Sequence, residues 1–174
     1  MKIQKSNVEK LMVTELEGLD PVAAYLEDQG EGRGKITITC YGKAWTAYWG
    51  AMGCGIREFV LSADNGYLIN KLDSRIERRV MAYDQTAIYA RKKIIEQRRD
   101  REITKRLARE YWQETEAMED VCCKDEIHKH VGCLQEIAGP FWYENFPQEE
   151  SCEYHHLNRI LTAVKDALAS EVQP

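Results

Sequence analysis

The residues of this sequence best suited to chemistry are its sulfur and imidazole side chains, which gather in the C-terminal third. All four histidines and four of the six cysteines fall within 35 residues of one another. Thiolate and imidazole groups are the ligands that zinc prefers in tetrahedral structural sites. The candidate ligands of a structural zinc ion are therefore Cys123, His128 and Cys133, completed by Cys152 or His155.

The spacing of these residues allows a second interpretation, in which no metal is bound. The sequence has no Cys-x2-Cys pair, so the cysteines can instead be small buried side chains and the histidines surface residues. It also has no His-Glu-x-x-His motif and no Gly-x-Ser-x-Gly nucleophile elbow. We therefore expect a protein that is not an enzyme and that needs no cofactor apart from the candidate structural zinc.

A second group of candidate residues forms a basic segment in the middle of the chain. Residues 91–109 contain nine Lys/Arg and three Asp/Glu, a local balance of +6. On a helix such side chains can follow a phosphate backbone or bind an acidic protein surface. Alternatively, neighbouring acidic residues pair with them and make a soluble helix. The basic residues predicted to contact a partner are Arg91, Lys92, Arg98, Arg99, Arg101, Lys105 and Arg106.

The 65 residues that follow are acidic, with four Lys/Arg and fourteen Asp/Glu. Most acidic surfaces only confer solubility. Carboxylates on a helical scaffold can also imitate a phosphate backbone and occupy the basic groove of a protein that handles nucleic acid. The acidic residues predicted to contact a partner are Glu114, Glu116, Glu119 and Asp120.

The elements that would position these surfaces define an α+β protein of two domains, 1–74 and 75–174. The first domain is expected to hold an antiparallel sheet of three or four strands over Val8–Trp49. Residues 35–40 alternate apolar and polar side chains, the pattern of a half-buried strand. Val8–Leu16 predicts a first strand, and Pro21–Asp28 predicts a strand or a short helix. Two helices over Ile56–Leu72 would cover the sheet.

The second domain is predicted to be helical. No glycine or proline occurs between Tyr67 and Val131, which favours a long helix or a broken helical pair from about Arg75 to Asp120. A single helix of about 40 residues would be about 60 Å long, so a second protomer is an economical explanation of what it packs against. A loop and a final helix are expected over Cys122–Ala169, with the aromatic segment at 141–146 pinned to the core.

Composition limits where the protein acts. No apolar run is long enough to span a membrane, and the first residues contain no signal-peptide core. We therefore expect a cytoplasmic protein with reduced cysteines. Its formal net charge of −5 disfavours general binding to nucleic acid.

Residues Leu19–Gly53, with the core KITITCYGKAW, resemble a segment of small proteins from tailed phages and enterobacterial prophages. The similarity continues weakly through Ile56–Leu72 and leaves out the half of the chain from Arg75 onward. It implies an accessory phage gene whose product acts in a bacterial cytoplasm. Small proteins of this kind often bind and disable a host system, including nuclease-based defence.

The hypothesis from sequence is thus a non-enzymatic, phage-encoded binding protein that inhibits a host defence of the CRISPR or nuclease type, or a nucleic-acid-processing complex. Its partner would be a host protein or nucleoprotein complex. Two alternatives stay open: a regulator that binds DNA or RNA directly through residues 91–109, and a zinc-stabilised structural module.

Overall fold

A computed structural model describes Ile3 and residues 8–170, and the chain forms two compact units. Unit 1 contains Met1–Arg78 and Glu150–Pro174, and unit 2 contains Arg79–Glu149. The first residues were expected to contain no signal-peptide core. Residues 1–7 lie outside the described part of the chain, with the exception of Ile3. The division differs from the expected boundary after residue 74, because the last helix belongs to unit 1 with the sheet.

The expected α+β fold is confirmed. Unit 1 contains a four-stranded antiparallel sheet in the order β1-β2-β3-β4, so strands adjacent in sequence are also adjacent in space. Its first strand is shorter than expected, and the segment after Pro21 is a strand rather than a short helix. The strands are β1 (Glu9–Val13), β2 (Val22–Gly30), β3 (Arg33–Cys40) and β4 (Lys43–Trp49).

The alternating side chains of β3 and β4 give the sheet one apolar face. Ile36 and Ile38 are buried, whereas Thr37 lies on the other face and hydrogen-bonds the hydroxyl of Thr46 on β4 at 2.9 Å. The β3–β4 hairpin turns on Tyr41 (φ 44°) and Gly42 (φ 76°). Two successive positive φ angles match the right-handed twist of the paired strands.

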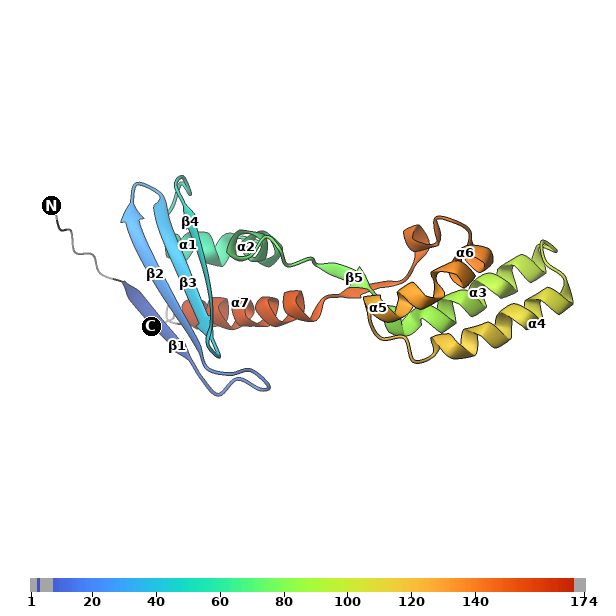
Figure 1. Cartoon of the computed structure of the whole chain (residues 1–174). Coiled ribbons are helices and arrows are strands. Elements are labelled where there is room, and N and C mark those ends of the chain that lie inside the picture. The colour runs from blue at the N-terminus through green and yellow to red at the C-terminus, as the bar shows by residue number, and fades with distance from the viewer. Residues whose placement is uncertain (1–2, 4–7, 171–174) are drawn as a thin grey trace. The chain divides into compact units, whose positions relative to one another are not determined.

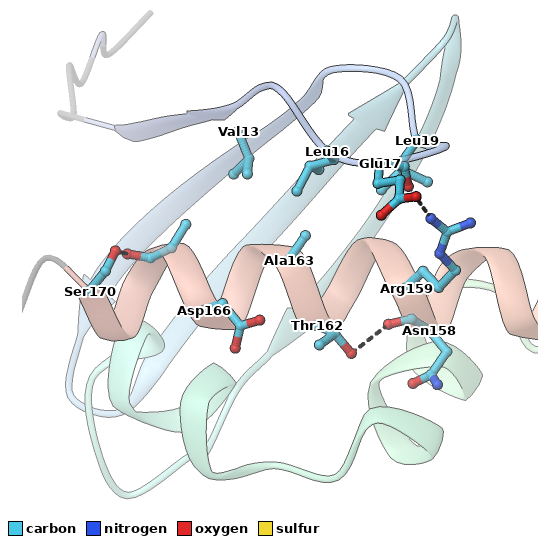
Figure 2. A pocket seen from close by; sticks show the side chains of 11 residues that line it. Val13, Leu16, Glu17, Leu19, Asn158, Arg159, Thr162, Ala163, Asp166 and Ser170 are labelled. Atoms are coloured by element: carbon cyan, nitrogen blue, oxygen red, sulfur yellow. Dashed lines mark hydrogen bonds between the residues drawn. The ribbon is translucent and has the colours of Figure 1, made fainter.

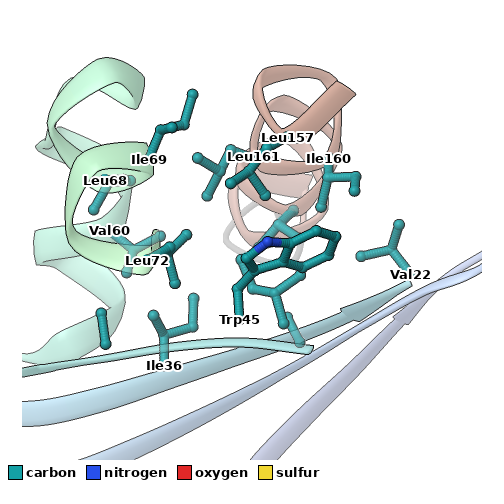
Figure 3. Packing of buried hydrophobic residues seen from close by; sticks show 14 of the residues in the cluster. Val22, Ile36, Trp45, Val60, Leu68, Ile69, Leu72, Leu157, Ile160 and Leu161 are labelled. Carbon is teal, nitrogen blue, oxygen red and sulfur yellow. The ribbon is translucent and has the colours of Figure 1, made fainter. Parts of the chain in front are cut away.

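Three helices cover the apolar face of the sheet: α1 (Ile56–Ser62), α2 (Asn65–Leu72) and α7 (Cys152–Ser170) (Figure 1). Figure 3 shows Ile36 and Trp45 of the sheet directed toward the buried side chains of these helices. The helix α7 buries six side chains, from Tyr154 to Leu168. Each contributes about 1.5–3 kcal/mol when fully removed from water.

A basic side chain of α7 also holds the loop between β1 and β2. The Arg159 guanidinium donates hydrogen bonds to the backbone carbonyls of Glu17, at 2.5 Å, and Gly18, at 3.2 Å. Beside this contact, a hollow of about 640 Å³ that is open to solvent lies between the loop and α7. Val13 and Leu16 form part of its lining (Figure 2). The C-terminal helix is therefore fixed to the beginning of unit 1 by both apolar and polar contacts.

Unit 2 is mainly helical and has its own core, which includes Tyr89, Ile94, Met118, Leu134 and Trp142. Its α-helices are α3 (Thr86–Arg99), α4 (Lys105–Glu114), α5 (Lys124–Ile127) and α6 (Val131–Ala138). Short 3-10 turns occur at Tyr83–Gln85, Thr115–Met118, His128–His130 and Trp142–Asn145. The ends of the unit run through two paired strands, β5 (Arg79–Met81) and β6 (Gln148–Glu150).

The prediction for the aromatic segment of unit 2 is correct for two of its four rings. Trp142 and Phe146 are buried, and the Tyr89 hydroxyl donates to the Trp142 carbonyl at 2.8 Å. Phe141 and Tyr143 are instead exposed.

A continuous helical rod is not formed, and the broken pair is the alternative that the structure supports. The helix begins at Thr86, and the segment around Ile76 and Val80, predicted to be helical, contains β5 instead. The helix ends at Arg99, and Arg101 takes a left-handed conformation (φ 62°). The next helix is capped by Thr104, whose hydroxyl accepts from the Leu107 N–H at 3.2 Å.

After α3, Arg101 adopts the left-handed backbone conformation that a glycine usually supplies at the end of a helix. The Glu102 N–H donates to the Gln97 carbonyl at 2.9 Å, the wider hydrogen bond of a Schellman motif. The helices α3 and α4 instead pack on each other. The argument that a single long helix would need a second protomer to pack against therefore no longer applies. A homodimer stays a prediction.

Gly34 on β3 offers a test of the contact between sheet and α1. A Cβ added there would lie 2.8 Å from the Ile56 Cβ and 3.1 Å from the Glu27 carbonyl oxygen. We expect Gly34→Ala to lower the free energy of unfolding of unit 1 by about 1–3 kcal/mol, measured by urea denaturation. Gly50→Ala, whose new Cβ would meet only Tyr48 at 3.7 Å, is the control. Equal effects of the two substitutions on the free energy of unfolding would contradict the close approach of Gly34 to Ile56.

Arg101 offers a test of the turn between α3 and α4. A non-glycine residue in the left-handed region costs roughly 1 kcal/mol. We therefore expect Arg101→Gly to raise the stability of unit 2 by up to about 1 kcal/mol, with a higher melting temperature by circular dichroism. Arg101→Ala removes the same charge but keeps the strain, so it should not stabilise. If Arg101→Ala is stabilised as well, the gain in stability comes from removal of the charge and not from relief of backbone strain.

Candidate partner-binding face

The predicted basic segment forms a surface with an apolar centre. On unit 2 the side chains of Ile88, Ile95 and Trp112 are 59%, 48% and 39% exposed. Ile88 and Ile95 are seven residues apart on α3 and so lie on one side of the helix. They do not belong to the side of α3 that enters the core, which presents Ala87, Tyr89, Ala90 and Ile94.

Two shallow hollows join these apolar side chains to basic ones. One, of about 520 Å³, lies between α3 and α4 and includes Ile95 and Trp112. The other, of about 410 Å³, follows α3 and includes Ile88 and, again, Ile95. We call the combined surface the α3–α4 face; its apolar centre is Ile88, Ile95 and Trp112, and its basic rim is Lys92, Arg98, Arg99, Lys105 and Arg109.

Most of the basic side chains are not neutralised by the protein's own carboxylates. In the segment 91–109, salt bridges join Lys93 to Glu96 at 2.8 Å and Arg106 to Glu110 at 3.7 Å. Within residues 8–170, no salt bridge is made by the five rim residues or by Arg101. The interpretation of a self-paired helix therefore applies fully to Lys93 and Arg106, whereas in the rim only Lys92 and Arg99 interact with the charge of Glu96, without a salt bridge among the described residues.

Arg91 differs from the rim because the fold of unit 2 uses it. Its Nε donates to the buried hydroxyl of Thr115 at 2.9 Å, and its guanidinium pairs with Glu119. The same guanidinium lies 5.4 Å from the centre of the Trp112 ring, within the range of a cation–π contact. Arg91 thus holds the indole of Trp112 in place on the face and is only partly available to a partner.

The predicted acidic residues are exposed but do not form one helical row. Glu114 ends α4, Glu116 lies in the following 3-10 turn, and Glu119 and Asp120 come after that turn. Since Glu119 pairs with Arg91 and Glu114 accepts a hydrogen bond from the Cys133 thiol, two of the four carboxylates are already engaged. The structure therefore gives less support to imitation of a phosphate backbone than to the basic face.

The predicted zinc ligands are divided between the two units. Cys123, His128 and Cys133 belong to unit 2, whereas Cys152 and His155 begin α7 in unit 1. His155 lies beside Glu150, with Nδ1 3.4 Å from a carboxylate oxygen, while His156 lines a hollow with Cys152. Over the described part of the chain, one group of three potential ligands converges, Cys122, Cys123 and Glu126. It shares only Cys123 with the predicted set.

Cys133 illustrates why a residue with a suitable ligand atom can be unsuited to metal binding. Burial against the core of unit 2 raises the pKa of its thiol to about 12, and a hydrogen bond with Glu114 together with that carboxylate's charge acts in the same direction. A metal binds the thiolate form. The surroundings of Cys133 therefore oppose the ionisation that coordination requires.

Three residues of the α3–α4 face, Ile88, Ile95 and Trp112, were not among the predicted contacts. A signal for them was present, since Ile88 and Ile95 fall outside the apolar stripe of their helix. Arg109 lay in the basic segment but was also not among the predicted contacts. Its place on the face follows from the hollow between the two helices, which a continuous helix would not have formed.

A sheet backed by helices and a separate helical unit define an α+β protein. The chain belongs to a phage family, Phage_phiTE_072, whose family model matches residues 1–170. The expected phage relationship is confirmed and extends well beyond residues 19–72. No curated protein and no solved structure matches the chain significantly. Among the described residues, no helix is both long and apolar enough to cross a membrane.

The contrast between Cys133 and Cys152 can be measured by alkylation. With a pKa of about 12, the Cys133 thiolate fraction at pH 8 is about 10⁻⁴, whereas an ordinary thiol is about one quarter ionised. We expect iodoacetamide to modify Cys133 about a thousand times more slowly than the exposed Cys152, followed by peptide mass spectrometry. The Cys133 rate should rise tenfold per pH unit from pH 7 to 9. Equal rates for the two thiols would contradict the burial of Cys133.

Proposed function

We propose that this phage protein is a non-catalytic binding protein whose α3–α4 face docks onto an acidic protein surface. The observation that carries the proposal is the combination of three exposed large apolar side chains with a rim of basic side chains that make no salt bridge within residues 8–170. Exposed apolar patches bordered by polar residues mark interaction sites. Tryptophan and arginine are also the side chains most often found at the energetic centre of protein interfaces.

Charge complementarity supports an acidic protein as the partner. The five rim residues would attract a surface rich in Asp and Glu, which speeds association and selects the partner. The apolar centre would then require a small apolar ridge on that surface. Two aliphatic side chains at the centre favour a protein over a phosphate backbone, because nucleic acid offers them few apolar groups outside its bases.

The phage family supports a more specific version of this proposal. Accessory proteins of phages act on their hosts, so the partner would be an acidic protein of the bacterial cytoplasm. A component of a CRISPR- or nuclease-type defence, or of a nucleic-acid-processing complex, is the class we propose. Blocking such a component by occupying its surface requires no catalytic group on the phage protein.

Direct binding to nucleic acid is the second candidate. Trp112 could stack on an unpaired base while Arg98 and Arg99 contact phosphates. That mode predicts affinity that falls steeply with salt. The chain's net charge of −5 opposes it, whereas an acidic protein partner contacts only the face.

The proposal can be tested by affinity enrichment of host proteins with two charge-matched double variants. Arg98→Glu with Arg99→Glu reverses charge on the rim. Lys43→Glu with Arg79→Glu makes the same change of net charge at exposed residues outside the face. We expect one acidic host protein to bind the wild type and the second variant and to lose at least tenfold in affinity for the first. Trp112→Ala should cost about 2 kcal/mol or more if Trp112 is an interface hot spot.

Nuclease treatment separates the two candidate functions. Enrichment that persists after the extract is digested with nuclease supports a protein partner. Enrichment that disappears, together with gel shifts that depend on Arg98 and Arg99, would replace our proposal with the nucleic-acid alternative. Equal recovery by both double variants would show that the α3–α4 face is not the binding surface.

A further inference from the structure

Two thiols and a carboxylate converge where the 3-10 turn after α4 leads into α5. The Sγ atoms of Cys122 and Cys123 and a carboxylate oxygen of Glu126 all lie within 4.8 Å of one another. Two ligand atoms on one tetrahedral zinc ion lie about 3.5–4 Å apart, given zinc–ligand distances of about 2.0–2.3 Å. Small side-chain rotations would therefore bring all three ligand atoms to an ion between them.

The backbone around the cluster is held in place before any ion binds. The Cys122 N–H donates to Glu126 Oε2 at 2.8 Å, and the Ile127 N–H donates to the Cys123 carbonyl at 3.2 Å. On either side, Val121 and Ile127 are buried in the core of unit 2. The three side chains are thus presented by a segment that is anchored at both ends.

The carboxylate and a thiol of the cluster also affect one another's ionisation. The Glu126 carboxylate raises the pKa of the Cys122 thiol by hydrogen bonding and by its negative charge. The Cys122 N–H and thiol, in turn, lower the pKa of Glu126. The raised pKa of Cys122 opposes ionisation of its thiol, so an ion must displace this proton in order to bind.

From this geometry we propose that Cys122, Cys123 and Glu126 form a binding site for one zinc ion, with the fourth coordination position open to solvent. The site differs from the set predicted from sequence, in which Cys123 was to be joined by distant histidines and cysteines. Two thiolates select a soft or borderline ion over magnesium or calcium, which take oxygen ligands. Both cysteines are exposed, so an ion can enter directly and can receive a fourth ligand from water or from a second molecule.

Binding is coupled to the release of two protons. Each thiol loses a proton as its sulfur bonds to the ion, while Glu126 is already ionised at neutral pH. Two thiolates and one carboxylate carry three negative charges, so the occupied site keeps one. Below the thiol pKa values, the apparent affinity should rise by up to about 100-fold per pH unit.

The site can be tested on the reduced full chain under anaerobic conditions, with zinc titrated against a chromophoric chelator. We expect one zinc ion per chain at micromolar affinity or tighter, with close to two protons released in weakly buffered solution. Cadmium or cobalt substitution should produce thiolate-to-metal charge-transfer absorption. Cys122→Ser and Cys123→Ser should each weaken zinc binding by about 100-fold, and Glu126→Gln by about 10–100-fold.

Cys152→Ser is the matched control, because Cys152 is also exposed but lies in unit 1. It should bind zinc as the wild type does. Circular dichroism of each variant shows whether the fold is retained. The proposal is overturned if folded wild-type protein binds no zinc at micromolar concentration, if both serine variants at the site bind normally, or if only the Cys152 variant loses binding. Binding of one zinc ion per chain would also overturn the proposal if the cadmium- or cobalt-substituted protein showed no thiolate-to-metal charge-transfer absorption.

Discussion

The burial of one face of the four-stranded sheet is the constraint on which the rest of the molecule depends. Alternating side chains in β3 and β4 place Ile36, Ile38 and Trp45 on one face, and that face must be removed from water. The two short helices α1 and α2 take part in this, but α7, from the other end of the chain, buries six further side chains in the same core. The chain must therefore return to the sheet, and unit 2 is an insertion between Arg78 and Glu150. The paired strands β5 and β6 bring the ends of that insertion together.

Local sequence patterns were sufficient for most of unit 1. The alternation in residues 35–40 predicted a strand where β3 lies, and the final helix expected within Cys122–Ala169 is α7. The partner of α7 could not be predicted in this way, because an amphipathic stripe indicates that a helix is covered without showing by what. The turn between α3 and α4 was uncertain for a different reason. Arg101 adopts a conformation that glycine usually supplies, so the absence of glycine suggested continuity. Thr104 was the available signal of a new helix.

The candidate site was predictable in its charge but not in its shape. Counting charges identified the basic segment, and most of its exposed basic residues do form the rim. The apolar centre arises from Ile88, Ile95 and Trp112, which come from two helices brought together by the turn. The metal ligands show the same limit. Composition identified the right segment, but convergence depends on which side chains the backbone directs toward one another. Adjacent Cys122 and Cys123 converge with Glu126, whereas residues with similar chemistry further along the chain do not join them.

The interruption of unit 1 by unit 2 has a consequence for biosynthesis. When the ribosome has translated the sheet, α1 and α2, the segment that completes their core does not yet exist. The nascent chain must present part of an apolar sheet face until all of unit 2 and then α7 have emerged. Unit 2, continuous in sequence and rich in local helical contacts, can fold within that interval. A product that stops before Cys152 would keep this face uncovered, which makes the final nineteen-residue helix the step that protects the newly made protein from aggregation.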